Sequence, residues 1–332
     1  MSNGNAPRVS IGVPVYNGEK FLRPTLDSLV SQTYRDIEII ISDNASTDGT
    51  ALICEEYAAR DSRVRYYRND RNIGPAPNYN RTLDLARGDV FKLAGADDLL
   101  APTFVQRCLR LLDEHSDTVV AYSLSKRIDE SGNVFGEWPV ELDLTGETPS
   151  ARLASYVFTD HRSHNAAEGW GLIRTTAARR FRPFLGSFPS ADRVLLVHLL
   201  LQGKIRRVDE PLFFDREHKA RSGRALSVER IRPGSRLVKY LGAGPMPAYE
   251  WWDSTKKDRI VFPEWRWLAG YWQAVGLAQM SHVERAKCAV VLSALNVKFA
   301  PRLVRDVVIG FEQVINRTAL ATIGLDQRRA TN

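Results

Sequence analysis

The sequence predicts an α/β protein, with a mostly parallel mixed sheet flanked by helices and a helical extension at the carboxyl end. Strand and helix signals alternate at short intervals through the first third of the chain, which is typical of parallel strands joined by crossover helices. Segment 37–41 is nearly all isoleucine, as expected of a strand covered on both faces. From about residue 225 the sequence becomes rich in tryptophan and helical in pattern.

Short apolar runs bounded by turn residues predict the strands in chain order. Seven segments are expected to be strands: Val9–Val15, 37–41, 64–67, 90–93, 118–123, 169–174 and 212–214. The first four come close together, with a helix between each pair. We therefore expect them to form the parallel part of the sheet.

Helices are predicted between and after these strands. The first has its apolar residues on one face, and Pro24 is best accommodated in its first turn. Ser46 or Thr47 is the expected cap of the second helix. Later helices are expected over 78–86 and 192–201.

The domain organisation follows the change in character near residue 225. We place a first domain over 1–224 and a helical extension over 225–332. Within the first domain, 1–125 carries the regular alternation of strands and helices, and 126–224 forms the second half. A chain of 332 residues with 44% hydrophobic content can bury a substantial core.

Charge and composition restrict the class of protein. The net charge of +7 suits phosphate-bearing partners, but the chain lacks helix-turn-helix and zinc-finger spacings, so we expect no nucleic acid. Cys54, Cys108 and Cys288 are widely separated and predict free, packed thiols. No apolar run approaches the roughly 20 residues of a membrane span, and the first residues lack the features of a signal peptide. We therefore expect a cytoplasmic protein.

Two adjacent carboxylates, Asp97 and Asp98, directly follow the apolar run that ends the fourth strand. Because neighbouring carboxylates repel, they need a cation, hydrogen-bond donors or water nearby. They fit either a divalent-metal site with a phosphate ligand or a pair of acids that cap the next helix. The first two strands also end in polar residues, at 16–18 and 43–44. The carboxyl ends of parallel strands meet at a ligand crevice, so convergence of these tips favours the metal site.

Several motifs occur in order over about the first 125 residues. They are 13–19 (VPVYNGE), 31–34 (SQTY), 38–50 (EIIISDNASTDGT), 72–74 (NIG) and 96–98 (ADD). Together they closely resemble the family 2 glycosyltransferases. The resemblance implies a GT-A fold and inverting transfer of a sugar from a nucleotide donor. It also implies that 1–125 is the nucleotide-binding half and 126–224 the acceptor and catalytic half.

The resemblance implies a donor pocket built from strand tips and loops. Its members would be Pro14, Val15, Tyr16, Glu19, Asp43, Asn44, Asn72 and Asp97. Tyr16 and Glu19 match residues that line the pocket for base and ribose, and Asp43 matches the acid that accepts a hydrogen bond from the imide N–H of uracil or thymine. The alternative role for all three is local turn and helix-start chemistry.

The acid matching Asp98 binds Mg²⁺ or Mn²⁺ in the family, and the one matching Asp97 lies near the ribose. Hard oxygen ligands suit either ion, and the donor phosphates would complete its shell. His218 resembles a histidine that approaches the metal or the diphosphate, and its alternative is a surface histidine in a basic loop. Many relatives carry an acid two residues before Asp97, whereas this chain has Gly95. We interpret this as a variant that keeps the metal.

Transfer also requires a base, because an acceptor hydroxyl is too weakly acidic to attack the anomeric carbon unaided. Family members place this acid at the start of a helix, usually as a Glu-Asp pair. Here Ala191 stands in the place of Glu, so Asp192 is the candidate base. Ordinary helix capping is the alternative role for Asp192.

The predicted function is the addition of one sugar from a uridine or thymidine diphosphate sugar to a glycan or lipid-linked acceptor in cell-envelope synthesis. The Gln-x-x-Arg-Trp sequence of processive synthases is absent, which favours single transfer. The alternatives are a sugar-nucleotide nucleotidyltransferase and a catalytically silent nucleotide- or glycan-binding protein. The basic segment 298–305 predicts a helix that lies on the inner face of the plasma membrane, or that packs on the domain or on a second subunit in a homodimer.

Overall fold

A nine-stranded mixed sheet forms the centre of the molecule. The computed structural model describes residues 6–138, 142–159, 167–188, 190–219 and 262–329. Its strands are β1 (Val9–Val15), β2 (Ile37–Asp43), β3 (Val64–Arg68), β4 (Val90–Leu93), β5 (Leu99–Leu100), β6 (Thr118–Ile128), β7 (Val134–Glu137), β8 (Leu172–Arg174) and β9 (Lys204–Arg216). They run in the order β3-β2-β1-β4-β8-β6-β9-β5, and β7 pairs with β6. The contacts among β1 to β4 are parallel, β6 and β9 are also parallel, and β8 runs antiparallel to both of its neighbours.

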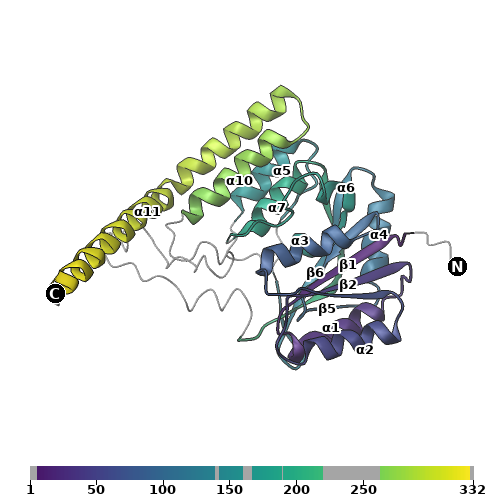
Figure 1. Ribbon diagram of the computed structural model, residues 1–332. Helices are drawn as coiled ribbons and strands as arrows, with labels where there is room; N and C mark the ends of the chain where they lie inside the picture. Colours follow the sequence, from purple (N-terminus) through teal and green to yellow (C-terminus); the bar gives the residue numbers. More distant parts are fainter. Residues whose placement is uncertain (1–5, 139–141, 160–166, 189, 220–261, 330–332) are drawn as a thin grey trace.

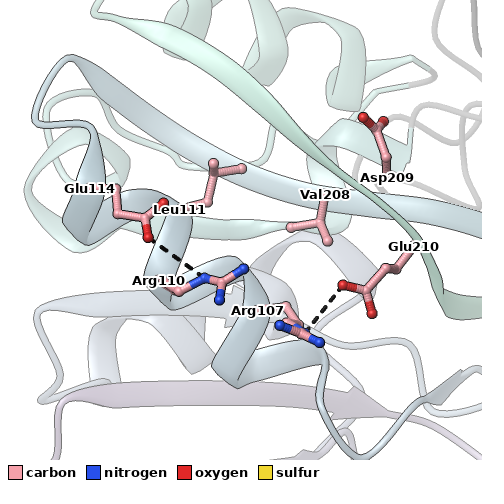
Figure 2. A pocket seen from close by; sticks show the side chains of 7 residues that line it. All are labelled: Arg107, Arg110, Leu111, Glu114, Val208, Asp209 and Glu210. Atoms are coloured by element: carbon pink, nitrogen blue, oxygen red, sulfur yellow. Dashed lines mark ion pairs between the residues drawn. The ribbon is translucent and has the colours of Figure 1, made fainter.

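Helices cover both faces of this sheet (Figure 1). They are α1 (Glu19–Val30), α2 (Thr50–Arg60), α3 (Pro75–Leu85), α4 (Phe104–Glu114), α5 (Pro149–Phe158), η1 (Ala167–Trp170), α6 (Thr175–Ala178), α7 (Ala191–Leu200), α10 (Pro263–Leu277) and α11 (His282–Arg329). One hydrophobic cluster joins α1, α2 and α4 to one face of the sheet. A second joins α3, α5, α7, α10 and α11 to the other. The α/β architecture with a carboxyl-terminal helical extension is therefore confirmed.

The strand predictions hold with three differences. Residues 169–170 belong to η1 and not to β8, the strand predicted over 212–214 is the last part of the longer β9, and β5 was not predicted. Two helix predictions were also wrong in detail. Helix α1 begins at Glu19, because the Gly18 carbonyl accepts the Phe21 and Leu22 N–H groups, so Pro24 lies inside the helix and not in its first turn. Pro24 is exposed, and water can replace its missing hydrogen bond. Neither Ser46 nor Thr47 caps α2. That helix starts at Thr50 after Gly49, with no side-chain cap.

The two carboxyl-terminal helices form an antiparallel hairpin that packs on α5 and α7. The start of α10 is tied to α11, because the Glu264 N–H donates to Asp306 at 2.7 Å and the Trp265 indole donates to the Leu303 carbonyl at 3.0 Å. Trp267 of α10 and Leu292 of α11 belong to the same buried cluster as α7. The hydrophobic core is thus continuous across the predicted boundary. The boundary itself lies outside the described residues and remains a prediction.

The three cysteines are free and buried, as predicted. None of the helices in the described ranges is both long and apolar enough to cross a membrane.

Candidate donor and catalytic site

The tips of three parallel strands lie side by side at one edge of the sheet. Strand β1 is central, with β2 and β4 as its neighbours. Val15 is in register with Asp43, and the chain leaves β4 through Ala94, whose N–H donates to the Gly12 carbonyl at 2.8 Å. The predicted convergence is therefore correct, and residues 16–18, 43–44 and 97–98 are neighbours.

Asp43 is fully buried at the end of β2 and holds the loop that follows. Its Oδ1 accepts the Ser46 N–H at 2.9 Å, and its Oδ2 accepts the Tyr66 hydroxyl at 3.0 Å with the Arg68 guanidinium at 3.4 Å. Burial, followed by this hydrogen bond, raises the pKa of Tyr66 to about 12. A carboxylate has about four lone-pair sites, so Asp43 can accept one more hydrogen bond, such as one from the N–H of a bound base. Tyr66 and Arg68 come from β3, and the sequence analysis did not include them.

Asn44 fastens the loop 69–74 to the tip of β2. Its Nδ2 donates to Asn72 Oδ1 at 2.8 Å and to the Gly74 carbonyl at 3.1 Å. Its Oδ1 accepts the Ile73 N–H and the Asn69 Nδ2, each at 2.9 Å. The predicted donor residues Asn44 and Asn72 are thus direct partners. Asn69, which the motif reasoning missed, completes the network from within the same loop.

The tip of β1 presents one exposed aromatic side chain. Pro14 and Val15 are buried, whereas Tyr16 is 50% exposed. Asn17 has a positive φ of 50° and accepts the Thr47 N–H at 2.8 Å. Glu19 is exposed and accepts the Gly49 N–H at 2.9 Å, at the start of α2. Tyr16 therefore offers a ring on which a base can stack, while Glu19 connects two helix starts.

The end of β9 and the residues that follow it contact the two acids that follow β4. Arg216 donates its backbone N–H to Asp98 Oδ1 at 2.9 Å and its Nε–H to the Asp97 carbonyl at 2.7 Å. The Nε2 of His218 lies 2.8 Å from Asp97 Oδ2. His218 is 8% exposed and its ring lies 4.7 Å from that of Phe21. The predicted residues Asp97, Asp98 and His218 therefore form one cluster, although they are over a hundred positions apart.

Arg216 is the residue that joins this cluster together. Its guanidinium is buried and also donates to the Asp129 and Glu130 carbonyls, both at 3.0 Å. The guanidinium thus holds two segments of main chain, at Asp97 and at 129–130. The sequence signal for Arg216 is its position two residues before His218, in the basic segment that follows the last strand.

A buried lysine supplies positive charge beneath the acids. Lys92 of β4 is 1% exposed and donates to the carbonyls of Leu93 at 3.2 Å and Trp170 at 2.5 Å. Burial lowers its pKa to about 8, against the opposing influence of Cys108 and Asp98. Lys92 and Arg216 together provide the compensation that paired carboxylates require.

Gly95 leaves the space that the two carboxylates occupy. A Cβ at this position would lie 2.8 Å from Asp98 Oδ2 and 2.9 Å from Asp97 Oδ1, which is too close for both acids to remain where they are. The absence of an acid at position 95 therefore has a structural explanation. Because glycine has no side chain, Asp97 and Asp98 can pack closely against the main chain at this position.

Asp192 lies in the first turn of α7 and is exposed. The preceding Ser190, at the N-cap, makes no side-chain cap hydrogen bond. Tyr79 of α3 is influenced by Asp192 and by the paired acids. Burial raises the pKa of its phenol, and the charges of Asp97, Asp98 and Asp192 raise it further. Tyr79 is thus within the electrostatic range of all three carboxylates. Tyr79 was not identified from the sequence.

The helix that carries Asp192 is supported from behind by the carboxyl-terminal hairpin. Tyr156 of α5 and Tyr271 of α10 are buried, and the charges of Asp192 and Arg193 influence the pKa of each phenol. Gly270 allows α10 to approach closely, since a Cβ there would lie 2.8 Å from both methyl carbons of Val194. The position of Asp192 thus depends on segments far away in the sequence.

The profile described as glycosyl transferase family 2 matches residues 10–181, which is more than half of the chain. The chain belongs to glycosyl transferase family 2. This confirms the resemblance of the amino-terminal motifs to this family.

Known proteins of this family support the same assignment. The chain is 29% identical over 157 residues to an uncharacterized glycosyltransferase of Methanocaldococcus jannaschii, covering 47% of this chain and 52% of that protein. It is 30% identical over 169 residues to chondroitin synthase of Escherichia coli, covering 50% of this chain and 24% of that protein. The chain thus matches about half or less of the length of these relatives.

A solved glycosyltransferase-like structure shares the fold of this chain, in agreement with the expected GT-A fold. S. aureus TarS 1–349 in complex with UDP-GlcNAc superposes with a TM-score of 0.53 at 16% identity, over 88% of this chain and 91% of that chain. At this level of identity the likeness concerns the fold.

The cluster at the end of β4 fits a metal ion that is shared with a phosphate ligand. The described residues hold no group of three metal-ligating side chains that could bind an ion alone. Mg²⁺ commonly uses one or two carboxylates together with substrate phosphates, which is the set that Asp97 and Asp98 can offer. The Nε2 of His218 is hydrogen-bonded to Asp97. For His218 to bind an ion through this nitrogen, the hydrogen bond to Asp97 would have to break.

Proposed function

We propose that this glycosyltransferase is an inverting, metal-dependent enzyme that moves one sugar from a UDP- or dTDP-sugar to a glycan or lipid-linked acceptor of the cell envelope. The observation that carries the proposal is the cluster of Asp97, Asp98, Arg216 and His218 where β4 and β9 end, beside the tips of β1 and β2. Two acids beside basic and histidine groups suit a nucleoside diphosphate, and the charge of a third acid, Asp192, reaches Tyr79 together with the charges of the pair. Family membership disfavours the nucleotidyltransferase alternative.

Asp192 would act as the base in this reaction. Its exposed carboxylate takes the proton from the acceptor hydroxyl as that oxygen forms a bond to the anomeric carbon, and the bond between that carbon and the diphosphate oxygen breaks. Attack from the side opposite the diphosphate inverts the anomeric centre. Arg193, the next residue in the same turn, adds a positive charge on this side of the site.

The donor side would bind the nucleotide and hold its phosphates. Tyr16 stacks on the base, and Asp43 accepts from the base imide while Tyr66 and Ser46 fix its orientation. Asp98 holds the Mg²⁺ or Mn²⁺ ion, with Asp97 beside the ribose and His218 beside the diphosphate. The bound ion would neutralise negative charge on the departing diphosphate.

A screen of nucleotide sugars tests the donor assignment. Binding and slow hydrolysis are measured calorimetrically and by nucleotide release, with Mn²⁺ and with a chelator. We expect a uridine or thymidine diphosphate sugar to bind in a metal-dependent manner. Binding of every nucleotide regardless of metal, or of none, would contradict the proposal, and binding without turnover would support the silent binding protein.

We also propose a cytoplasmic location. For the carboxyl-terminal helices the sequence left open a lipid surface, the domain itself and a second subunit. The structure shows packing on the domain for one face of α11. The surface on its opposite face favours the second subunit over lipid, for the reasons that follow.

A further inference from the structure

Helix α11 exposes apolar side chains at a strict spacing of seven residues. Val283, Val290, Val297, Val304 and Phe311 are 65%, 70%, 75%, 53% and 66% exposed. Val314 and Ile315 continue the same strip at 47% and 64%. These seven residues are called the heptad stripe below.

The heptad stripe is separate from the face that α11 uses within the molecule. Cys288, Leu292, Leu295 and Leu303 are buried in the core cluster, and they interleave with the valines along the helix. Figure 1 shows the end of α11 extending away from the rest of the protein. Most of the stability of helices in proteins comes from packing of an apolar face against other elements. The part of α11 that extends away from the protein would gain such packing from a partner.

Small side chains lie three positions after the first three valines. Ala286, Ser293 and Ala300 follow Val283, Val290 and Val297, and all three are exposed. A β-branched residue that recurs every seven positions, with a second contact position three residues later, has the spacing of a coiled-coil seam.

Three basic side chains of α11 contact other side chains of the protein. Lys298 lies over the ring of Phe158 at 5.8 Å, and Arg302 lies over the ring of Phe299 at 4.8 Å. Lys287 pairs with Glu284 at 2.9 Å. The cations that predicted a lipid contact are therefore engaged with the protein itself.

The spacing also distinguishes a helix partner from a flat surface. A straight α-helix drifts by about 20° per heptad, so a seven-residue stripe from Val283 to Phe311 winds around the helix by about 80°. A second helix follows this winding by supercoiling. A lipid surface is flat and would lose contact with one end of the stripe.

The exposed area is close to that of a stable interface. The seven side chains expose roughly 750 Å², compared with about 800 Å² per partner in a standard protein–protein interface and about 300–600 Å² for the largest apolar patch of a typical monomer. We propose that α11 is a dimerisation surface, on which the heptad stripes of two copies of this chain pair around a two-fold axis. The interface is isologous, since each stripe packs on the same stripe of the partner.

Sedimentation velocity or light scattering at tens of micromolar protein tests this proposal. We expect the wild-type chain to be a dimer. The double variant Val290→Lys/Val297→Lys places four ammonium groups in the seam and should weaken dimerisation at least a hundredfold, giving a monomer. Both valines are at least 70% exposed, so the monomer should fold, which circular dichroism verifies.

Lys298→Gln/Arg302→Gln is the matched control on the same helix, and it should remain a dimer. Both variants are also mixed with vesicles of phosphatidylcholine and phosphatidylglycerol. A monomeric wild-type chain, or a Val290→Lys/Val297→Lys variant that stays dimeric, would overturn the proposal. The proposal would also be overturned if the wild-type chain were a monomer that binds the vesicles and the Lys298→Gln/Arg302→Gln variant no longer bound them. None of these readouts depends on the donor or on transfer.

Discussion

The two sides of the candidate site are held in place by different kinds of interaction. On the donor side, Asp43, Asn44 and Asp97 each have polar partners within 3.0 Å, largely from loops near the same sheet edge. On the base side, Asp192 is exposed and its helix is positioned by apolar packing on α10. The comparison teaches that the donor side depends on local hydrogen-bond networks, whereas the base side depends on tertiary packing.

Replacement of the base should give the largest effect. Asp192→Asn keeps the size of the side chain and removes its ability to take a proton, so transfer should fall by about 10² to 10⁴-fold. Donor affinity should not change, because the donor contacts belong to the opposite side. Transfer is measured by product formation and donor binding by calorimetry. If transfer persists in Asp192→Asn, another group is the base and the division between the two sides is wrong.

The packing behind Asp192 can be tested with two glycines of the same helix. Gly270→Ala places a Cβ 2.8 Å from Val194, whereas Gly276→Ala meets nothing within 4 Å. Both substitutions gain about 1 kcal/mol of helix propensity, but overpacking costs about 1–3 kcal/mol. We expect Gly276→Ala to raise the free energy of unfolding, and Gly270→Ala to lower it and to reduce the rate of transfer.

Donor binding should be the same in both glycine variants, and chemical denaturation measures their stability. Equal stabilisation by the two substitutions, with unchanged transfer, would show that α10 does not position the base.

The same contrast explains what the sequence could predict. The strands and the convergence of their tips follow from local patterns of apolar and turn residues. Asn44 and Asn72 were assigned to one pocket by the family resemblance, and the hydrogen bond between them joins positions 28 residues apart. The basic segment after the last strand marks Arg216, but its contacts and those of Tyr79 involve elements far away in the sequence, which a local pattern does not reveal. The caps of α2 were mispredicted for a similar reason, since Ser46 instead accepts the Asn17 N–H at 2.9 Å.

Crowding the paired acids should weaken donor binding by a smaller factor. Gly95→Ala forces Asp97 and Asp98 away from their positions, and we expect about a tenfold loss of donor affinity in the presence of Mn²⁺, equivalent to about 1.4 kcal/mol. Gly169→Ala is the control, because a Cβ there meets nothing within 4 Å. Calorimetric titration of both variants measures the difference. Unchanged donor affinity in Gly95→Ala would show that Asp97 and Asp98 do not contribute to donor binding.

The smallest expected effect concerns the junction of α10 and α11, which supports the base side. Burial raises the pKa of Asp306 to about 6, while the Glu264 N–H that it accepts opposes this. Between pH about 4 and about 6 the folded state keeps a proton that the unfolded state has released, so the free energy of unfolding should fall as pH rises through this interval. We expect a change of about 1 kcal/mol.

Asp306→Asn isolates this contribution, because its amide oxygen can still accept the Glu264 N–H. Urea unfolding of wild type and variant is compared at several pH values. We expect the variant to gain stability over the wild type as pH rises from about 4 to about 6 and to keep that gain above it. Donor affinity should not follow the same pH dependence, since Asp306 belongs to the packing that supports α7. A parallel loss of donor affinity in this interval would show that the two sides of the site are coupled through the core.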